Sequence, residues 1–280
     1  MRCAWKQLLA ILPPKYRSQV EAAGREQLEQ IRLGVGSCPQ LQLGGKPHWL
    51  PEPAVQADVD YVINAASRYS PWTAATMAQG YLTAPGGHRI GLCGEAVCRG
   101  GSMEGLRRVQ SVCIRVAKDY PGIARSADFA AGSVLILGAP GWGKTTLLRD
   151  LIRRRSESSA VAVVDERREL FPEGFSQGKH LDVLSGCPKH QALERLLRTM
   201  SPECIAVDEI TEQTDAQALL KANHCGVCLL ATAHAASLED FQKRQVYRPL
   251  VEQRVFSWVI LLHRDKSYTL ERMVPCAANG

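Results

Sequence analysis

A buried-strand pattern that runs straight into a phosphate-binding loop limits the fold of this chain more than any other feature. Residues 133–138 (SVLILG) are a continuous apolar run, which is typical of a strand buried on both faces of a parallel sheet. The run leads into GAPGWGKTTLLRD, residues 138–150, which fits the pattern G-x-x-x-x-G-K-[ST]. A strand, a glycine-rich loop and a helix in this order predict a P-loop domain that binds nucleotide phosphates.

The loop predicts ATP and Mg²⁺ as ligands. Its glycines let backbone N–H groups point at phosphate oxygens, and the helix N-terminus adds partial positive charge. We expect Lys144 to reach the β and γ phosphates and Thr145 to hold Mg²⁺. Trp142 either packs over the nucleotide or faces a neighbour. The expected nucleotide contacts are Gly138, Ala139, Pro140, Gly141, Trp142, Gly143, Lys144, Thr145 and Thr146.

The remainder of the C-terminal half alternates strand and helix patterns. Further strand patterns, most of them with helical segments between, cover residues 160–166, 204–209, 227–234, 254–264 and 267–274. This alternation predicts an α/β fold with a mostly parallel sheet. Ligands of such sheets bind beyond the carboxyl ends of the strands. We assign residues 126–280 to this ATPase domain.

The first 125 residues have a different sequence pattern, with more Gly and Pro and with short segments of mixed type. Helical spacing at 55–70, a hairpin over 80–97 around a Pro-Gly-Gly turn, and a strand at 111–117 predict a smaller α+β domain. Residues 118–132 are expected to connect it to the ATPase domain. We therefore assign residues 1–125 to an N-terminal α+β domain with its linker.

Carboxylates follow two of the predicted strands at the edge where ligands bind. Asp208 and Glu209 end one strand, where one carboxylate suits Mg²⁺ and the other can orient or deprotonate the attacking water. We expect Asp208 to hold the metal; an acidic N-terminus of the next helix is the competing interpretation. Asp165 and Glu166 end a second strand and predict further hydrolytic groups, against a structural surface role for Glu166. The pattern leaves open whether Glu166 or Glu209 orients water.

Three other features carry weaker signals. His234, at the end of a strand pattern, can hydrogen-bond a phosphate or be purely structural. Cys225 and Cys228 form a C-x-x-C that we interpret as packing rather than as metal or redox chemistry. The basic run from Arg149 to Arg155 is expected to be a solvated helix end that the helix dipole favours.

Composition narrows the class of protein. The 280 residues are 45% hydrophobic and 22% charged, as in soluble globular proteins, and no apolar run reaches the length that spans a bilayer. The apolar patch before Pro13 predicts a first helix and not a signal peptide. Ten cysteines without such a signal suggest reduced thiols in the cytosol. The net charge of +6 allows contact with a membrane or nucleic acid and demands neither.

Taken together, the motifs resemble a known family. VVDER, LLRTMSPECIAVDEI and ATAHA, which follow GAPGWGKTTLLRD, are similar to motifs of the secretion and type IV pilus ATPases. Segments along nearly the whole chain, among them EQIRLGVGSCP, QGYLTAPGGHRIGLCGEAV and DVLSGCPK, resemble the stage III sporulation protein AA family of endospore-forming bacteria. The resemblance implies a RecA-like P-loop ATPase core after the smaller N-terminal domain.

The same resemblance implies a location, an assembly and partners for the protein. It indicates a cytoplasmic ATPase that works as a hexameric ring, peripherally associated with the membrane proteins of a sporulation channel complex. By motif position, Asp165 and Glu166 match the acidic box of secretion ATPases, Glu209 their second Walker motif, and His234 the last histidine of their histidine box. Three positions depart from the family pattern: Gly34 and Ser37, where arginines are expected, and Val227, where a histidine is expected.

Ring motors complete the site with an arginine from outside the P-loop core, which stabilises charge in the transition state. We assign this role to Arg89 of the N-terminal domain, and surface charge is the competing role for this side chain. Further candidates are Arg107, Arg108, Arg115 and Arg198.

Three other functions stay open. A nucleic-acid-associated P-loop ATPase is the main alternative, although the chain ends at Gly280 soon after the last predicted strand, so we expect no appended nucleic-acid module. No interleaving of aromatic and basic residues offers a stacking platform either. A nucleotide-binding scaffold without turnover and a small-molecule kinase are the other two.

Overall fold

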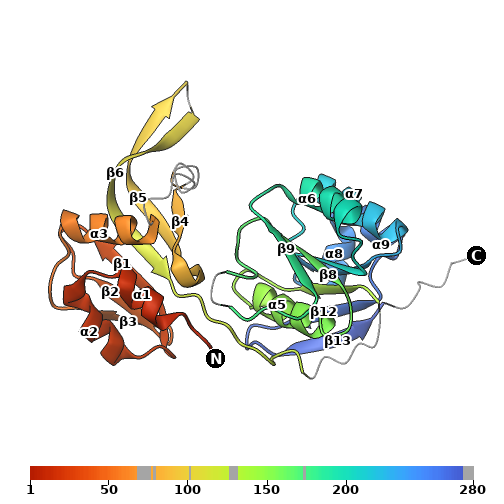
Figure 1. Ribbon diagram of the computed structural model, residues 1–280, viewed down its shortest axis with the longest axis horizontal. Helices are drawn as coiled ribbons and strands as arrows, with labels where there is room; N and C mark the ends of the chain where they lie inside the picture. Colours follow the sequence, from red (N-terminus) through yellow and green to blue (C-terminus); the bar gives the residue numbers. More distant parts are fainter. Residues whose placement is uncertain (68–76, 78–79, 101, 126–131, 173–174, 274–280) are drawn as a thin grey trace, which may run out of the picture. The chain divides into compact units, whose positions relative to one another are not determined.

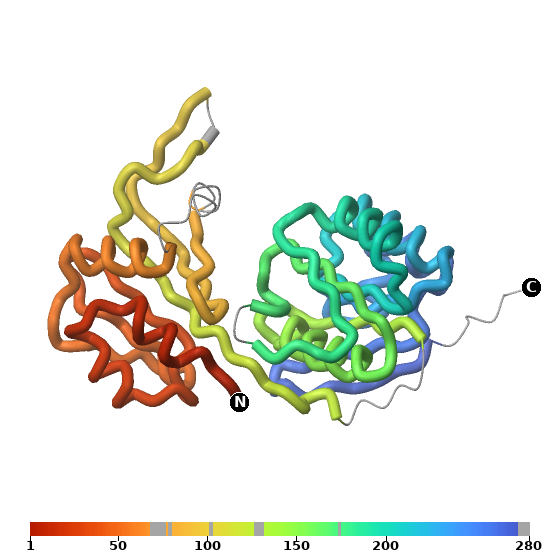
Figure 2. Tube along the Cα trace, in the orientation of Figure 1, coloured from red at the N-terminus to blue at the C-terminus, as the bar shows by residue number. Residues whose placement is uncertain are grey.

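Contacts within the chain divide it into two units, which Figures 1 and 2 show. The computed structural model describes residues 1–67, 77, 80–100, 102–125, 132–172 and 175–273. The first unit consists of Met1–Asp119 with Pro172–Phe175, and the second consists of Tyr120–Phe171 with Ser176–Gly280. The domain boundary placed between residues 125 and 126 stays a prediction.

The N-terminal unit is an antiparallel sheet of six strands in the order β3-β2-β1-β6-β5-β4, with helices against it. Leu8, Val59 and Ile114, from two helices and the sheet, share one buried core. The described elements are α1 (Trp5–Ile11), α2 (Pro14–Ala23), β1 (Leu28–Gly34), β2 (Gln40–Leu43), β3 (Lys46–Trp49), α3 (Gln56–Ser67), β4 (Tyr81–Thr83), the 3-10 turn η1 (Pro85–Gly87), β5 (Arg89–Arg99) and β6 (Ser102–Arg115).

The elements predicted for this unit are present. The first helix ends before Pro13, the helix at 55–70 is α3 as far as the described residues reach, and the Pro-Gly-Gly turn joins β4 to the antiparallel β5. Residues 68–70 of that predicted helix lie outside the described residues. The strand at 111–117 is the end of β6, which is longer than predicted because it pairs with β5 along its whole length.

The second unit is the mostly parallel α/β sheet that the sequence predicts. Its seven strands lie in the order β13-β12-β7-β11-β10-β8-β9, and only β13 runs antiparallel to its neighbour. The strands are β7 (Val134–Leu137), β8 (Val161–Asp165), β9 (Leu181–Ser185), β10 (Cys204–Val207), β11 (Cys228–Ala233), β12 (Trp258–Leu262) and β13 (Tyr268–Arg272). The described helices are α5 (Lys144–Arg155), α6 (Lys189–Thr199), α7 (Gln213–His224), α8 (Leu238–Lys243) and α9 (Arg248–Glu252).

Helices cover both faces of this sheet, which explains its continuous apolar strands (Figure 1). Leu135 of β7 packs in a core with residues of α6 and α7, whereas Ile136, one residue on, packs in a second core with residues of α5. Successive strand residues point to opposite faces, so each needs an apolar side chain. Within the described residues, no helix has the length and apolar character to cross a bilayer.

The prediction that the basic run on α5 is a solvated helix end is wrong for two of its arginines. Arg149 and Arg153 are buried. The Arg149 guanidinium donates to the backbone carbonyl oxygens of Leu170 and, at 2.7 Å, of Glu169, and Arg153 donates to that of Ser176 at 2.8 Å. The loops after β8 pass against α5, and their carbonyl groups need donors that no strand ladder supplies.

The same helix binds the start of the segment that leads into this unit. The carboxylate of Asp150, which is buried, accepts the backbone N–H groups of Gly122 at 2.8 Å and Ala124 at 2.9 Å. The Arg154 guanidinium donates to the carbonyl oxygen of Ala124. The C-terminal half of α5 therefore fixes this segment from both its donor and its acceptor side.

Asp150→Ala is expected to destabilise the protein by about 2 kcal/mol, because a buried and a partly buried N–H group lose a charged acceptor. Denaturant unfolding of wild type and variant measures the difference. The control is Glu157→Ala near the end of the same helix, which removes an exposed ion pair with Lys179 and should cost less than about 1 kcal/mol. Equal losses for both variants would contradict the role given to Asp150.

Candidate active site

The phosphate loop lies where the sequence motif places it, between the buried strand β7 and the first turn of α5. Gly141 and Gly143 have φ values of 76° and 105°, a region that side-chain-bearing residues rarely adopt. A Cβ atom at either position would meet no atom within 4 Å. The backbone conformation, and not crowding, therefore requires glycine here, and the space in front of the loop is open.

Lys144 lies back against its own loop. Its ammonium group donates to the carbonyl oxygens of Gly138 at 2.9 Å and Ala139 at 3.1 Å, and lies 2.9 Å from Nδ1 of His234. Burial lowers the pKa of Lys144, while the nearby carboxylates of Asp208 and Glu209 act in the opposite direction. The site thus holds a desolvated cation beside the loop, which suits binding of phosphate oxygens.

Asp208 follows β10 and is held by two hydroxyl groups. Thr145 donates to one carboxylate oxygen at 2.8 Å, and Thr232 of β11 donates to the other at 2.7 Å. Burial raises the pKa of Asp208; the two hydrogen bonds lower it, and the charges of Glu209 and Asp165 add to the rise. An alcohol oxygen beside a carboxylate is a donor set that fits Mg²⁺, which binds through a few protein oxygens and keeps several waters.

Glu209 has a strained backbone and a fixed side chain. Its φ of 58° lies in the left-handed region, and its N–H donates to the Thr232 hydroxyl at 2.7 Å. One carboxylate oxygen lies 2.8 Å from Nε2 of His234, and the other accepts a hydrogen bond from Arg167 at 3.0 Å. The histidine therefore bridges Glu209 and Lys144.

The second acidic strand end has different partners. Both carboxylate oxygens of Asp165 accept backbone N–H groups of its own loop, from Glu169, Leu170 and Phe171. These bonds shape the loop after β8, so the catalytic role of Asp165 stays a prediction. Glu166 points to Lys189, whose ammonium group lies 2.8 Å from its carboxylate.

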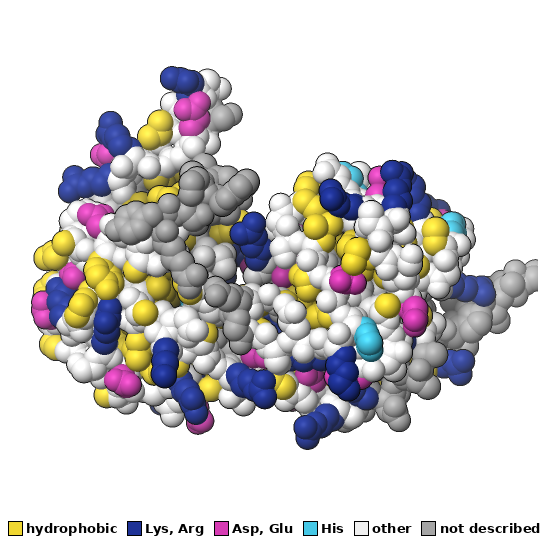
Figure 3. Space-filling view, viewed as in Figure 1, with side chains coloured by type: hydrophobic (Ala, Val, Ile, Leu, Met, Phe, Trp, Pro, Cys, Tyr) yellow, Lys and Arg dark blue, Asp and Glu magenta, His cyan; other side chains and the backbone are white. Residues whose placement is uncertain are grey.

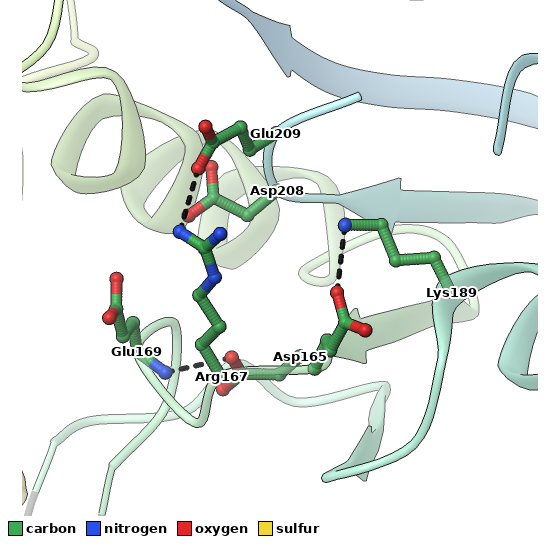
Figure 4. A pocket seen from close by; sticks show the side chains of 7 residues that line it. Asp165, Arg167, Glu169, Lys189, Asp208 and Glu209 are labelled. Atoms are coloured by element: carbon green, nitrogen blue, oxygen red, sulfur yellow. Dashed lines mark hydrogen bonds and ion pairs between the residues drawn. The ribbon is translucent and has the colours of Figure 1, made fainter. Parts of the chain in front are cut away.

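The acidic residues that follow β8 and β10 share one pocket with Arg167 and Lys189 (Figure 4). Arg167 reaches across it to Glu209, and Lys189 lies apart from that pair. The lining residues are Asp165, Glu166, Arg167, Glu169, Lys189, Asp208 and Glu209. The pocket lies at the strand edge where ligands of parallel sheets bind.

The other residues singled out in the sequence do not line this pocket. Arg89 belongs to the N-terminal unit, where its guanidinium lies 4.4 Å from the centre of the Tyr81 ring, so its role stays a prediction. Trp142 is partly buried and packs against the core on the α5 side of the sheet. Among the described residues, no group of three His, Cys, Asp or Glu side chains is placed to hold a metal, so the Cys225 and Cys228 pair has no such partners.

Two residues of the site were missed by sequence reasoning. Thr232 connects Asp208 to the backbone of Glu209, and Lys189 neutralises Glu166. Thr232 stands two residues before His234 on a buried strand, where a polar residue in an apolar run is a usable signal. Lys189 follows Pro188 at the start of α6, and its spacing from the acidic motif carries no signal because the contact is tertiary.

Comparisons with known proteins agree with this architecture. The family model described as "Sporulation stage III, protein AA" matches residues 6–272. Stage III sporulation protein AA of Bacillus subtilis is 34% identical over 93% of this chain and 91% of its own length. The ATPase DotB of Legionella pneumophila has a TM-score of 0.62 at 17% identity, covering 93% of this chain and 80% of DotB. The pilus retraction motor PilT has a TM-score of 0.66 at 15% identity, covering 93% of this chain and 83% of PilT. At these identities the two structures confirm the RecA-like fold.

Asp208→Asn is expected to raise the stability of the protein at neutral pH in Mg²⁺-free buffer. The folded-state pKa of Asp208 lies above the unfolded value of 3.8, so the ionised carboxylate costs stability at high pH. That cost disappears as the pH falls through the raised pKa towards 3.8, and the variant's advantage should shrink with it. Urea unfolding at several pH values measures this difference.

The asparagine can keep both hydroxyl contacts, because the Thr145 hydroxyl can rotate to accept from the amide. Asp182→Asn on the edge strand β9 is the control, since that side chain is exposed. An advantage of Asp208→Asn that stays constant or grows as the pH falls would contradict the assignment.

Proposed function

We propose that this chain, which belongs to the sporulation stage III protein AA family, is an ATP-hydrolysing motor of a sporulation secretion-type channel complex. In this proposal it works as a hexameric ring on the cytoplasmic side of a membrane, against the membrane proteins of that complex. The observation that carries the proposal is the convergence of Lys144, the Thr145–Asp208 pair and the His234–Glu209 pair at one edge of the sheet.

Each residue has a role in the proposed reaction. The N–H groups of the loop and of the first turn of α5 bind the phosphates, and Lys144 exchanges the carbonyl oxygens of Gly138 and Ala139 for phosphate oxygens. Thr145 and Asp208 would hold Mg²⁺, which supplies neutralising charge to the β and γ phosphates. Glu209 orients the attacking water, and His234 fixes the Glu209 carboxylate at 2.8 Å.

The proposed motor function is supported by the names of two structural neighbours. One structural neighbour is named an ATPase and another a pilus retraction motor, and both share only the fold with this chain at 17% and 15% identity. Arg89 is our candidate for the guanidinium that completes the site in the ring, where it would stabilise transition-state charge.

The alternative, a nucleic-acid-associated ATPase, loses part of its support. Arg149 and Arg153 of the dense basic run bind loop carbonyl oxygens and are buried, so they do not face a phosphate backbone. On the face that Figure 3 shows, Lys and Arg side chains are spread out and mixed with acidic ones. Binding of DNA or RNA that weakens steeply with salt would favour the alternative.

Phosphate release from ATP, measured against protein concentration, tests the proposal. The rate per chain should rise with concentration, because an arginine from another copy completes the site. Lys144→Ala should abolish turnover through lost phosphate binding. Glu209→Gln should keep ATP binding and lose turnover by about 10²- to 10⁴-fold, because the water loses its base.

Matched controls come from an exposed ion pair on α6 and α7. Lys221→Ala and Glu194→Gln remove the same kinds of charge 3.4 Å apart at the surface and should turn over like wild type. Tight ATP binding by wild type without phosphate release at any concentration would favour a scaffold and count against the motor.

A further inference from the structure

Lys189 is a buried cation outside the predicted motifs. Its side chain is 8% exposed, and its ammonium group lies 2.8 Å from a carboxylate oxygen of Glu166. Two weaker contacts complete its surroundings, the Thr211 hydroxyl at 3.4 Å and a carboxylate oxygen of Asp215 at 3.6 Å. A lysine held this deeply is retained only where carboxylates compensate its lost hydration.

The partners of Lys189 come from separate elements. Glu166 directly follows β8, Thr211 stands two residues after Glu209, and Asp215 lies in the first turn of α7. One oxygen of Asp215 also accepts the N–H groups of Thr211 at 3.1 Å and of Glu212 at 3.3 Å. The ammonium group thus connects one acidic strand end to the segment that carries the other.

Glu166 and Glu209 line the same pocket. β8 and β10 are parallel neighbours in which Val164 pairs with Val207, so the segments that carry Glu166 and Glu209 follow the same ends of adjacent strands. Each has its own cation, Lys189 at 2.8 Å for Glu166 and Arg167 at 3.0 Å for Glu209. Without Lys189, Glu166 would be an uncompensated like charge close to Glu209, free to turn into the pocket.

We propose that Lys189 is a positioning residue, which holds Glu166 aside and so leaves Glu209 as the carboxylate that orients the attacking water. This inference rests on the proposed ATPase function and adds a division of labour between the two acidic strand ends. A purely structural lysine would stabilise the fold equally but would leave turnover per folded molecule unchanged.

The test is a double-mutant cycle on turnover. Lys189→Met should lower kcat by about ten- to a hundredfold with little change in KM for ATP, because a displaced Glu166 disturbs the reacting water and not the phosphate loop. Glu166→Gln alone should lower kcat less than Glu209→Gln does, because in this proposal Glu209 orients the water. The double variant Lys189→Met/Glu166→Gln should recover towards Glu166→Gln, because the unpaired charge is gone.

Stability is measured in parallel so that folding and positioning separate. Lys221→Met is the matched control, a lysine on α7 whose glutamate partner is exposed. If Lys189→Met does not fold, Lys189→Gln enters the same cycle, since it keeps an N–H donor at nearly the same reach. Rates are expressed per folded protein from circular dichroism and active-site titration with a fluorescent ATP analogue.

Two results would overturn the inference and leave the proposed function standing. The first is an active wild type with unchanged kcat in Lys189→Met. The second is loss of turnover in Glu166→Gln alone, which would make Glu166 the residue that orients water. A wild type without phosphate release at any concentration would remove the proposed function, and this inference with it.

Discussion

The carboxylate of Asp208, held between the hydroxyl groups of Thr145 and Thr232, is the interaction on which the rest of the site depends. It joins the helix that follows the phosphate loop to two neighbouring strands, β10 and β11. Burial of the Asp208 carboxylate disfavours its charged form, which raises its pKa. The hydrogen bonds from Thr145 and Thr232 offset part of this effect. The Thr232 hydroxyl also accepts the N–H of Glu209, so the same contact fixes the next carboxylate.

Helix α5 connects the phosphate loop to other segments of the second unit. Its first turn holds Lys144 and Thr145, and its buried C-terminal half holds Arg149, Asp150 and Arg153. These three bind the backbone of the loops after β8 and of the segment at 122–124. One helix therefore contacts the phosphate loop, the loop shaped by Asp165 and the start of the unit, which gives the proposed motor a rigid element for transmitting changes at the nucleotide site.

Much of this fold could be predicted because its signals are local. The four central strands are continuous apolar runs, and the phosphate loop needs glycines whose φ values are positive. The strands β2, β3 and β9 could not, because each has only four or five residues and no continuous apolar run. The tertiary contacts of single side chains could not be predicted either. Arg149 has the same local sequence pattern as a solvated arginine, and only the loop that passes over α5 buries it.

Glu166 and Glu209 show the same limit inside the site. Each follows an aspartate at the end of a buried parallel strand, so the sequence gives no reason to separate their roles. Their surroundings differ: Glu209 has a left-handed backbone and a histidine partner, whereas Glu166 faces a buried lysine.

The charge of the pocket also bears on the roles of its acidic residues. Five carboxylates and two cations line it, an excess of negative charge to which nucleotide phosphates would add. Within the described lining, Arg167 pairs with Glu209 and Lys189 pairs with Glu166, so neither cation is free for the phosphates. In the proposed motor, the balancing positive charge would come from Lys144 beside the loop, from a divalent ion at Thr145 and Asp208, and from a guanidinium outside the pocket. A site that is negative in this way would favour hydrolysis only when those cations are assembled, which gives the proposed motor a physical reason to couple turnover to ring formation.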